Sequence, residues 1–160
     1  MTTILLILFI IFGGRSYPVI QQYGQEPTWI SRTPGAVTQF NRGDGLGFLA
    51  HNYLAGADFA ALRPGDIITV VYSDESKSYY LVSRSYDYKH IGYRLYQFTD
   101  TGQNLASDAL LDTMYQPGEL TLQTCIAQGG NDEWGRLFVH AHPVTFTRHA
   151  LTRAPVHEAK

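Results

Sequence analysis

Two strand-like segments near the C-terminal end constrain the fold of this chain more than any other feature. In residues 120–125 leucines alternate with polar residues, and Cys125 falls on the polar face. In residues 136–141 Arg136 falls on one face and small or branched apolar side chains fall on the other. Successive side chains of a strand point to opposite faces, and the glycine-rich residues 128–133 are typical of a turn or loop. The pattern predicts a β-hairpin that brings Cys125 close to Arg136, with the leucines facing a core.

The rest of the chain carries further short strand-like runs and few helical ones. Runs rich in β-branched and aromatic residues predict strands at residues 36–40, 46–51, 67–72, 79–86 and 93–98. A polar run at 73–78 predicts a hairpin turn. Residues 105–114 have apolar side chains near helical spacing and predict a helix, whereas residues 59–66, which contain Pro-Gly, predict a short helical turn. Many short strands favour an all-β fold, a closed β-barrel of about eight strands with one or two short helices.

Length and composition favour one globular domain. The chain has 160 residues, of which 44% are hydrophobic, so it can bury a core of its own. A net charge of -2 gives no electrostatic reason to bind nucleic acid. The single cysteine excludes a disulfide within the chain. The glycine-rich residues 43–47 come before a strand rather than after one, so they do not fit a dinucleotide-binding fingerprint.

Cys125 is a candidate nucleophile, although a single cysteine can also be a small packed side chain. A free thiol has a pKa of about 8.5, so only roughly a few per cent of it is ionised at neutral pH. A cationic neighbour can raise that fraction, and His51 and Arg136 are residues of the right type. Both are separated from Cys125 by a loop or by much of the chain, so only the fold can bring the three together.

The sequence resembles the active site of sortases, bacterial cysteine transpeptidases, in the run Thr121-Leu122-Gln123-Thr124-Cys125. Arg136 follows the cysteine by eleven positions, and His51 lies in an earlier strand-like segment. The resemblance covers roughly residues 45–144 and implies a sortase-like closed barrel. It also implies that Cys125 is the nucleophile, that His51 transfers protons, and that Arg136 stabilises the oxyanion with support from Thr124.

The same resemblance implies a reaction and its partners. The Cys125 thiolate would attack a C-terminal sorting signal of a secreted protein, similar to Leu-Pro-any-Thr-Gly, and form a thioester. An amine of a peptidoglycan cross-bridge or of a pilin lysine would then accept the acyl group, and no cofactor is needed. Two alternatives stay open: a sortase-fold thiol peptidase that releases its product with water, and a non-catalytic surface β-barrel that binds a peptide or a metal.

The N-terminal residues suggest a cellular location. Residues 4–12 are an unbroken apolar run, shorter than the roughly 20 residues that a membrane-spanning helix needs. We expect residues 1–14 to be a signal segment or a truncated membrane anchor, with a buried strand or helix of the domain as the alternative. Residues 15–44 are then a linker and first strand, residues 45–148 the catalytic barrel, and residues 149–160 a C-terminal tail. The protein is expected at the extracellular face of the bacterial cytoplasmic membrane.

Two sets of potential metal ligands are further alternatives. His140 and His142 lie two residues apart on one strand face, a spacing that can chelate zinc with His51 or His90 as a supplement. A calcium site similar to that of some sortases would use acidic residues, of which the candidates are Asp108, Asp112, Asp132 and Glu133. The simpler interpretation is that these histidines are partly exposed and that the acids are solvated.

Overall fold

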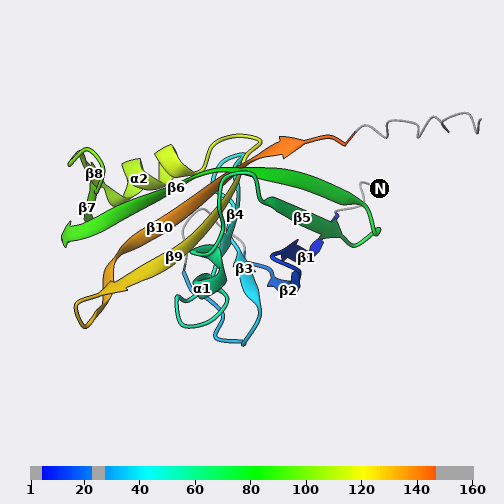
Figure 1. Cartoon of the computed structure of the whole chain (residues 1–160), viewed down its shortest axis with the longest axis horizontal. Coiled ribbons are helices and arrows are strands. Elements are labelled where there is room, and N and C mark those ends of the chain that lie inside the picture. Colours follow the sequence, from blue (N-terminus) through cyan, green and yellow to red (C-terminus); the bar gives the residue numbers. More distant parts are fainter. Residues whose placement is uncertain (1–4, 23–27, 147–160) are drawn as a thin grey trace, which may run out of the picture.

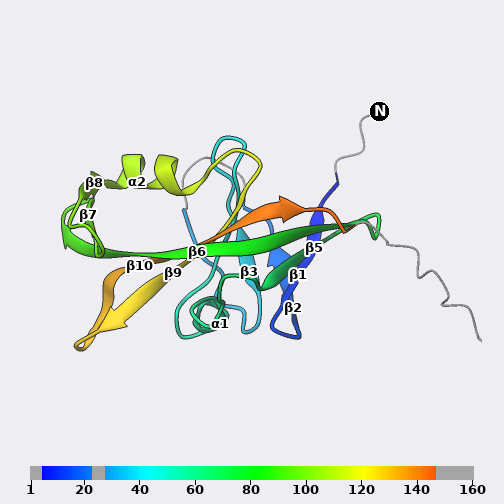
Figure 2. The same cartoon turned by 45° about the horizontal axis from the view of Figure 1, so that its top comes forward.

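The computed structural model describes residues 5–22 and 28–146, which form ten strands and two helices (Figures 1 and 2). The strands are β1 (Ile7–Phe12), β2 (Arg15–Ile20), β3 (Val37–Gln39), β4 (Leu46–Leu49), β5 (Ile67–Tyr72), β6 (Lys77–Gly92), β7 (Leu95–Phe98), β8 (Asn104–Ala106), β9 (Leu120–Gln128) and β10 (Asn131–Val144). The helices are α1 (Gly56–Phe59) and α2 (Ser107–Met114).

Eight of the described strands close into a barrel. Hydrogen-bonded neighbours follow the order β10-β9-β4-β3-β2-β1-β5-β6, and the pairing of β6 with β10 joins the two ends. The pairs β2–β3 and β4–β9 are parallel, and the other pairs are antiparallel. Strands β7 and β8 continue the sheet from β6 outside the barrel, next to α2 (Figure 1). Closure pairs every strand of the barrel on both sides, which confirms the predicted all-β barrel with its one or two short helices.

The alternation of side chains gives β9 and β10 two buried faces. Inside the barrel, Leu122 and Val139 are fully buried within the main core, as the alternating leucines predict. On the other face, Phe138 packs with Leu110 and Leu111 of α2 in a second core. Helix α2 therefore lies over the outer face of the strands that contain Cys125 and Arg136.

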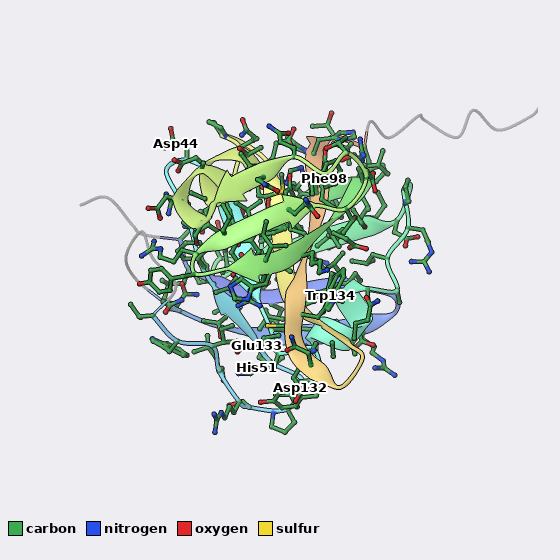
Figure 3. All side chains as sticks on the ribbon, turned by 90° about the vertical axis from the view of Figure 1, so that its left-hand side faces the viewer. Asp44, His51, Phe98, Asp132, Glu133 and Trp134 are labelled. Carbon is green, nitrogen blue, oxygen red and sulfur yellow. The ribbon has the colours of Figure 1, made fainter. Side chains whose placement is uncertain are left out.

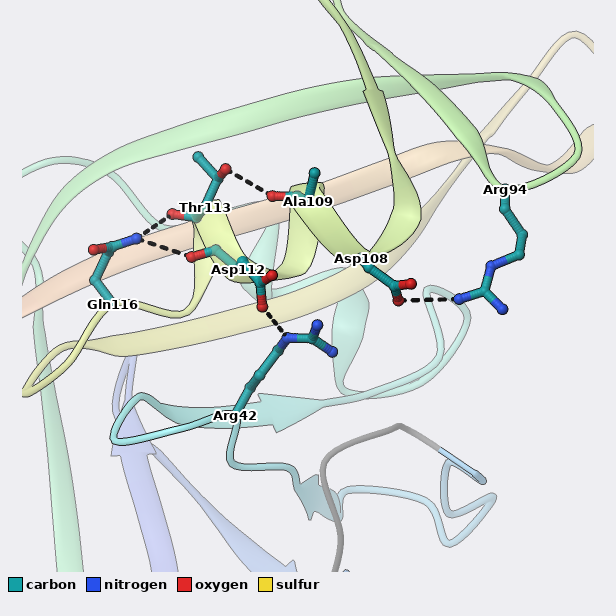
Figure 4. Close-up of polar contacts among 7 residues, drawn as sticks. All are labelled: Arg42, Arg94, Asp108, Ala109, Asp112, Thr113 and Gln116. Carbon is teal, nitrogen blue, oxygen red and sulfur yellow. Dashed lines mark hydrogen bonds and ion pairs between the residues drawn. The ribbon is translucent and has the colours of Figure 1, made fainter.

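Two ion pairs link α2 to neighbouring parts of the chain (Figure 4). Arg42 Nε lies 2.7 Å from Asp112 Oδ1, and Arg94 Nη2 lies 3.0 Å from Asp108 Oδ1. The helix predicted at residues 105–114 is thus present and is held from the β3–β4 side and from the β6–β7 turn. The apolar face of α2 packs against the sheet through Leu110, Leu111 and Met114, and these partly exposed ion pairs add a small contribution.

The N-terminal apolar run is part of the barrel. Residues 7–12 form β1, which pairs with β2 and β5, and Ile10 and Phe12 are buried in the main core. The prediction of a signal segment or anchor over residues 1–14 is wrong for β1, and that of a linker from residue 15 is wrong for β2. The alternative of a buried strand is correct. An unbroken apolar run has no period of two or of 3.6, so it does not distinguish these structures.

Several element boundaries differ from the prediction: β6 (Lys77–Gly92) is much longer than the predicted strand at 79–86, and residues 105–106 of the predicted helix belong to β8. Helix α1 ends where the predicted helical turn of residues 59–66 begins. The expected loop at residues 128–133 shrinks to a tight turn at Gly129 and Gly130, whose φ angles are 60° and 77°. Positive φ at both central residues matches the twist of a two-residue hairpin, so both strands extend further than predicted.

No helix within the described residues is long and apolar enough to cross a membrane. Residues 1–4 and the predicted tail at 149–160 lie outside the described residues.

Candidate active site

The β9–β10 hairpin places Cys125 beside Arg136. The two residues are direct partners in the antiparallel register. Residues directly opposite each other in such a pair point to the same face, with Cβ atoms about 4.5–5.5 Å apart. The cysteine and the arginine therefore lie side by side on the outer face of the barrel, as the alternation in the sequence predicts.

Cys125 and Arg136 line a pocket of about 330 Å³, and Thr124 contributes to the same wall. Cys125 is half-buried, so its thiol is neither fully packed nor fully exposed. The remaining walls are mostly apolar, with Trp29, Ile30, Leu49, Tyr96, Leu110, Leu111 and Phe138 beside the polar Thr28, Ser107 and Gln123. Local sequence patterns do not mark most of these residues as pocket walls, because they come from separate segments that only the closed barrel brings together.

A buried glutamine, Gln22, holds the segment that places Trp29 in the pocket wall. Gln22 is 8% exposed, and its Oε1 accepts hydrogen bonds from the backbone N–H groups of Thr28, at 3.1 Å, and Trp29, at 3.0 Å. The hydroxyl of Thr28 donates to the same oxygen at 2.9 Å. One side chain thus holds the end of this segment against the pocket, in a region that the sequence presents as a linker.

Burial and two neighbouring charges change the pKa of Cys125 in opposite directions. Burial raises the pKa of the thiol, the Arg136 guanidinium lowers it, and the Glu133 carboxylate raises it. Arg136 Nη1 donates to the carbonyl oxygen of Gly135 at 3.2 Å, and its guanidinium carbon lies 5.9 Å from the centre of the Tyr96 ring. Because the net shift of the Cys125 pKa is upward, the thiol is protonated at neutral pH, and a base is needed to ionise it during a reaction.

The Thr124 side chain makes a structural contact, whereas oxyanion support by backbone donors near this residue stays a prediction. The side chain is buried, and its hydroxyl donates a hydrogen bond of 2.8 Å to the carbonyl oxygen of Ala50. A hydroxyl has one proton to donate, so in this arrangement the Thr124 side chain does not donate to an oxyanion. It instead connects β9 to the chain that leads into His51.

His51 follows the end of β4, which runs parallel to β9. Leu49 is the partner of Gln123, and the backbone N–H of Ala50 donates to the Gln123 carbonyl oxygen at 3.2 Å. This pairing ends at Leu49, two residues before His51, where the chain leaves β4 and enters a turn. The imidazole stacks on the Tyr53 ring, with centroids 5.0 Å apart and planes 21° apart, and is not part of the pocket wall. Figure 3 views the molecule from the end with the β9–β10 turn and labels His51 together with Asp132 and Glu133 of β10.

The metal-site alternatives find no support in the geometry. His140 is 7% exposed, burial lowers its pKa, and its ring packs 4.8 Å from the Tyr86 ring. Asp108 and Asp112 are engaged by arginines. Across residues 5–22 and 28–146, no three or more histidine, cysteine or acidic side chains are grouped closely enough to hold a metal ion.

Replacing Glu133 by Gln should make the Cys125 thiol more acidic, because the substitution removes a negative charge that raises its pKa. The rate of alkylation by iodoacetamide, measured against pH, should shift to lower pH. At pH 7.5 the gain should be less than about tenfold, because an exposed charge is strongly screened. High salt should reduce the difference, since the Debye length falls to about 3 Å at 1 M. Asp132→Asn is the matched control, and a Glu133→Gln profile that coincides with wild type at low salt would contradict the assignment.

Comparisons with known proteins address the fold. No protein-family model matches the chain, and no curated protein matches it. Among solved structures, the chain is similar to sortase A from Corynebacterium diphtheriae, with a TM-score of 0.59, 17% identity, and coverage of 89% of this chain and 62% of that one. For sortaseC1 from Streptococcus suis the TM-score is 0.57 and the identity 16%, over 90% of this chain and 75% of that one.

A third solved structure is similar to this chain in the same way. Sortase C from Clostridium perfringens SM101 matches with a TM-score of 0.54 and 15% identity, over 88% of this chain and 70% of that one. Identities this low establish similarity of fold and leave the chemistry to be argued from the site itself. The closed barrel that places Cys125 and Arg136 side by side on neighbouring strands is therefore a sortase fold.

Proposed function

We propose that this protein is a sortase-type cysteine transpeptidase. It would cleave a C-terminal sorting signal of secreted proteins and transfer the new acyl end to an amine. The observation that supports this proposal most directly is the cross-strand pairing of Cys125 with Arg136 in an apolar-walled pocket of a sortase fold. A nucleophile next to a fixed cation, beside an apolar pocket, supplies two of the groups that acyl transfer through a thioester needs, and the third is a base.

In the first step, Cys125 Sγ attacks the carbonyl carbon of the residue before the scissile bond. The thiol proton passes to a ring nitrogen of His51, which then protonates the leaving amine as the C–N bond breaks. Arg136 donates hydrogen bonds to the oxyanion of the tetrahedral intermediate. The acyl group then remains on Cys125 as a thioester. We assign this role to His51 because the resemblance to sortases implies it and because His51 follows β4, the parallel neighbour of β9.

In the second step, an amine attacks the thioester carbonyl and His51 removes its proton. The Cys125 sulfur leaves as a thiolate and regains a proton, which completes the cycle. A peptidoglycan cross-bridge amine would anchor the protein to the cell wall, and a pilin lysine would join pilus subunits. Water in place of the amine gives a free acid, which is the product of the peptidase alternative.

The pocket and the resemblance together suggest the substrate class. Aromatic and aliphatic side chains such as Trp29, Leu110 and Phe138 surround the space beside Cys125, which favours an apolar residue in the bound signal. A signal similar to Leu-Pro-any-Thr-Gly meets that requirement. Substrates of this kind are exported, so we propose the extracellular face of the bacterial cytoplasmic membrane as the site of action.

The proposal is tested by incubating the purified protein with peptides of the Leu-Pro-any-Thr-Gly type, with and without triglycine or a lysine-containing peptide as acceptor. Mass spectrometry of the products should show an amide between the acyl fragment and the acceptor, and intact-protein mass spectrometry should show an acyl adduct on Cys125. Free acid as the sole product in excess amine would favour the peptidase. Absence of cleavage and of any adduct across a panel of signals would favour a non-catalytic barrel.

A further inference from the structure

We propose that Gly56 is a positioning residue for His51. Its missing side chain lets the turn of residues 51–56 close against Thr124 of β9, and this contact sets the direction of the His51 side chain. The consequence for turnover rests on the proposed function, whereas the geometric part of the proposal does not.

Gly56 sits at a point where three oxygen atoms converge. A Cβ atom at this position would overlap Thr124 Oγ1, and it would lie 2.6 Å from the carbonyl oxygen of His51 and 2.9 Å from that of Ala50. Two of these oxygens belong to the backbone and cannot rotate away as a flexible side chain can. Only glycine permits such an approach, so any other residue must move the turn away from β9.

The same carbonyl groups are held by hydrogen bonds. The Ala50 carbonyl oxygen accepts from Thr124 Oγ1 at 2.8 Å. The His51 carbonyl oxygen accepts from the backbone N–H groups of Leu54, at 3.0 Å, and Gly56, at 3.1 Å. Gly56 therefore donates a hydrogen bond within this turn, and its lack of a side chain allows the turn to pack against Thr124.

These bonds fix both peptide units that flank the His51 Cα. The Ala50 carbonyl belongs to the peptide bond before His51, and the His51 carbonyl belongs to the peptide bond after it. With the two peptide planes held, the direction of the His51 Cα–Cβ bond is determined, and stacking on Tyr53 orients the ring. Gly56 and Thr124 thus act on the imidazole through the backbone, without touching the reacting atoms.

Gly56→Ala should displace the imidazole, and this can be measured without substrate. The ring-proton NMR signals of His51, assigned by their loss in His51→Ala, should shift because the ring moves relative to the Tyr53 ring current. Gly92→Ala is the matched control, since a Cβ at Gly92 meets only Leu95 Cβ, at 4.0 Å. A His51 signal unchanged in Gly56→Ala would overturn the proposal.

The effect on the reaction should appear as a coupling between Gly56 and His51. A misplacement of about 1 Å can lower the rate by about 10²-fold, so kcat for Gly56→Ala should fall by roughly 10- to 100-fold. Added to His51→Ala, the same substitution should cause little further loss, because the group it positions is already absent. The reactivity of Cys125 with iodoacetamide, at saturating pH, should stay at the wild-type value. Independent, additive losses would overturn the proposal.

Thr124→Val provides a second route if Gly56→Ala does not fold. Valine keeps the size of the side chain but removes the hydrogen bond to the Ala50 carbonyl oxygen. The His51 ring signals should again shift, and the loss of kcat should again disappear in the His51→Ala background. If the wild-type protein transfers no acyl group, the proposed function fails, yet the NMR comparison still decides whether Gly56 and Thr124 position His51.

Discussion

Cys125→Ala should form no acyl-enzyme with any sorting-signal peptide, and its turnover should fall by on the order of 10⁴-fold or more. The thioester requires the sulfur atom, and Cys125 is the only cysteine in the chain. The fold should survive, because Cys125 is half-buried in the pocket wall and belongs to neither hydrophobic core. The measurements are turnover, intact-protein mass spectrometry and thermal unfolding on the same preparations.

Thermal unfolding separates loss of the nucleophile from loss of the structure. Truncation of a half-buried side chain outside both cores is expected to change the unfolding free energy by about 1 kcal/mol or less. A folded Cys125→Ala protein with wild-type turnover would exclude Cys125 as the nucleophile. An alanine variant that unfolds would leave Cys125→Ser as the folded comparison, in which a poorer nucleophile of similar size should still give no adduct.

Arg136→Lys should lose nearly as much turnover as Arg136→Ala, on the order of 10² to 10³-fold, or about 3 to 4 kcal/mol. Lysine keeps the positive charge but has a flexible stem and no planar fork, so its hydrogen bonds to an oxyanion are not directed in the same way. The guanidinium also lies 5.9 Å from the centre of the Tyr96 ring and donates to the Gly135 carbonyl, contacts that hold it in place.

The alkylation rate of Cys125 separates the charge of Arg136 from its geometry. The guanidinium lowers the thiol pKa, so in Arg136→Ala the pH profile should move to higher pH. In Arg136→Lys the charge remains and the profile should stay close to wild type, although turnover is lost. Arg84→Lys is the control in the same sheet, because Arg84 pairs with Asp100 at 3.0 Å and is not part of the pocket wall. Recovery of most of the activity by lysine would show that charge alone is sufficient.

The elements predicted well from the sequence are those with a clear local period. The alternation in residues 120–125 and 136–141 predicts two strands, their buried faces and the proximity of Cys125 to Arg136, and the structure contains all three. The helical spacing in residues 105–114 likewise corresponds to α2. Such patterns succeed because one face of a strand or helix must be buried, and the spacing of apolar residues records which face.

The sequence was least informative where local patterns are absent or ambiguous. The apolar run that became β1 has no period, and its place between β2 and β5 depends on pairing with residues about 60 positions away. Trp29 reaches the pocket from a segment without strand or helix signals, held there by Gln22. No spacing rule indicates such contacts, because they form only when the barrel closes.

The sequence by itself determined the type of chemistry available: one thiol, on the polar face of a strand, with an arginine opposite it across a turn. Only the tertiary structure decided the state of that thiol and the place of His51. Burial in the pocket raises the Cys125 pKa, and hydrogen bonds to the carbonyl oxygens of Ala50 and His51 hold the backbone on both sides of His51. Desolvation and close packing depend on atoms from distant parts of the chain, whereas side-chain alternation is set by the local backbone.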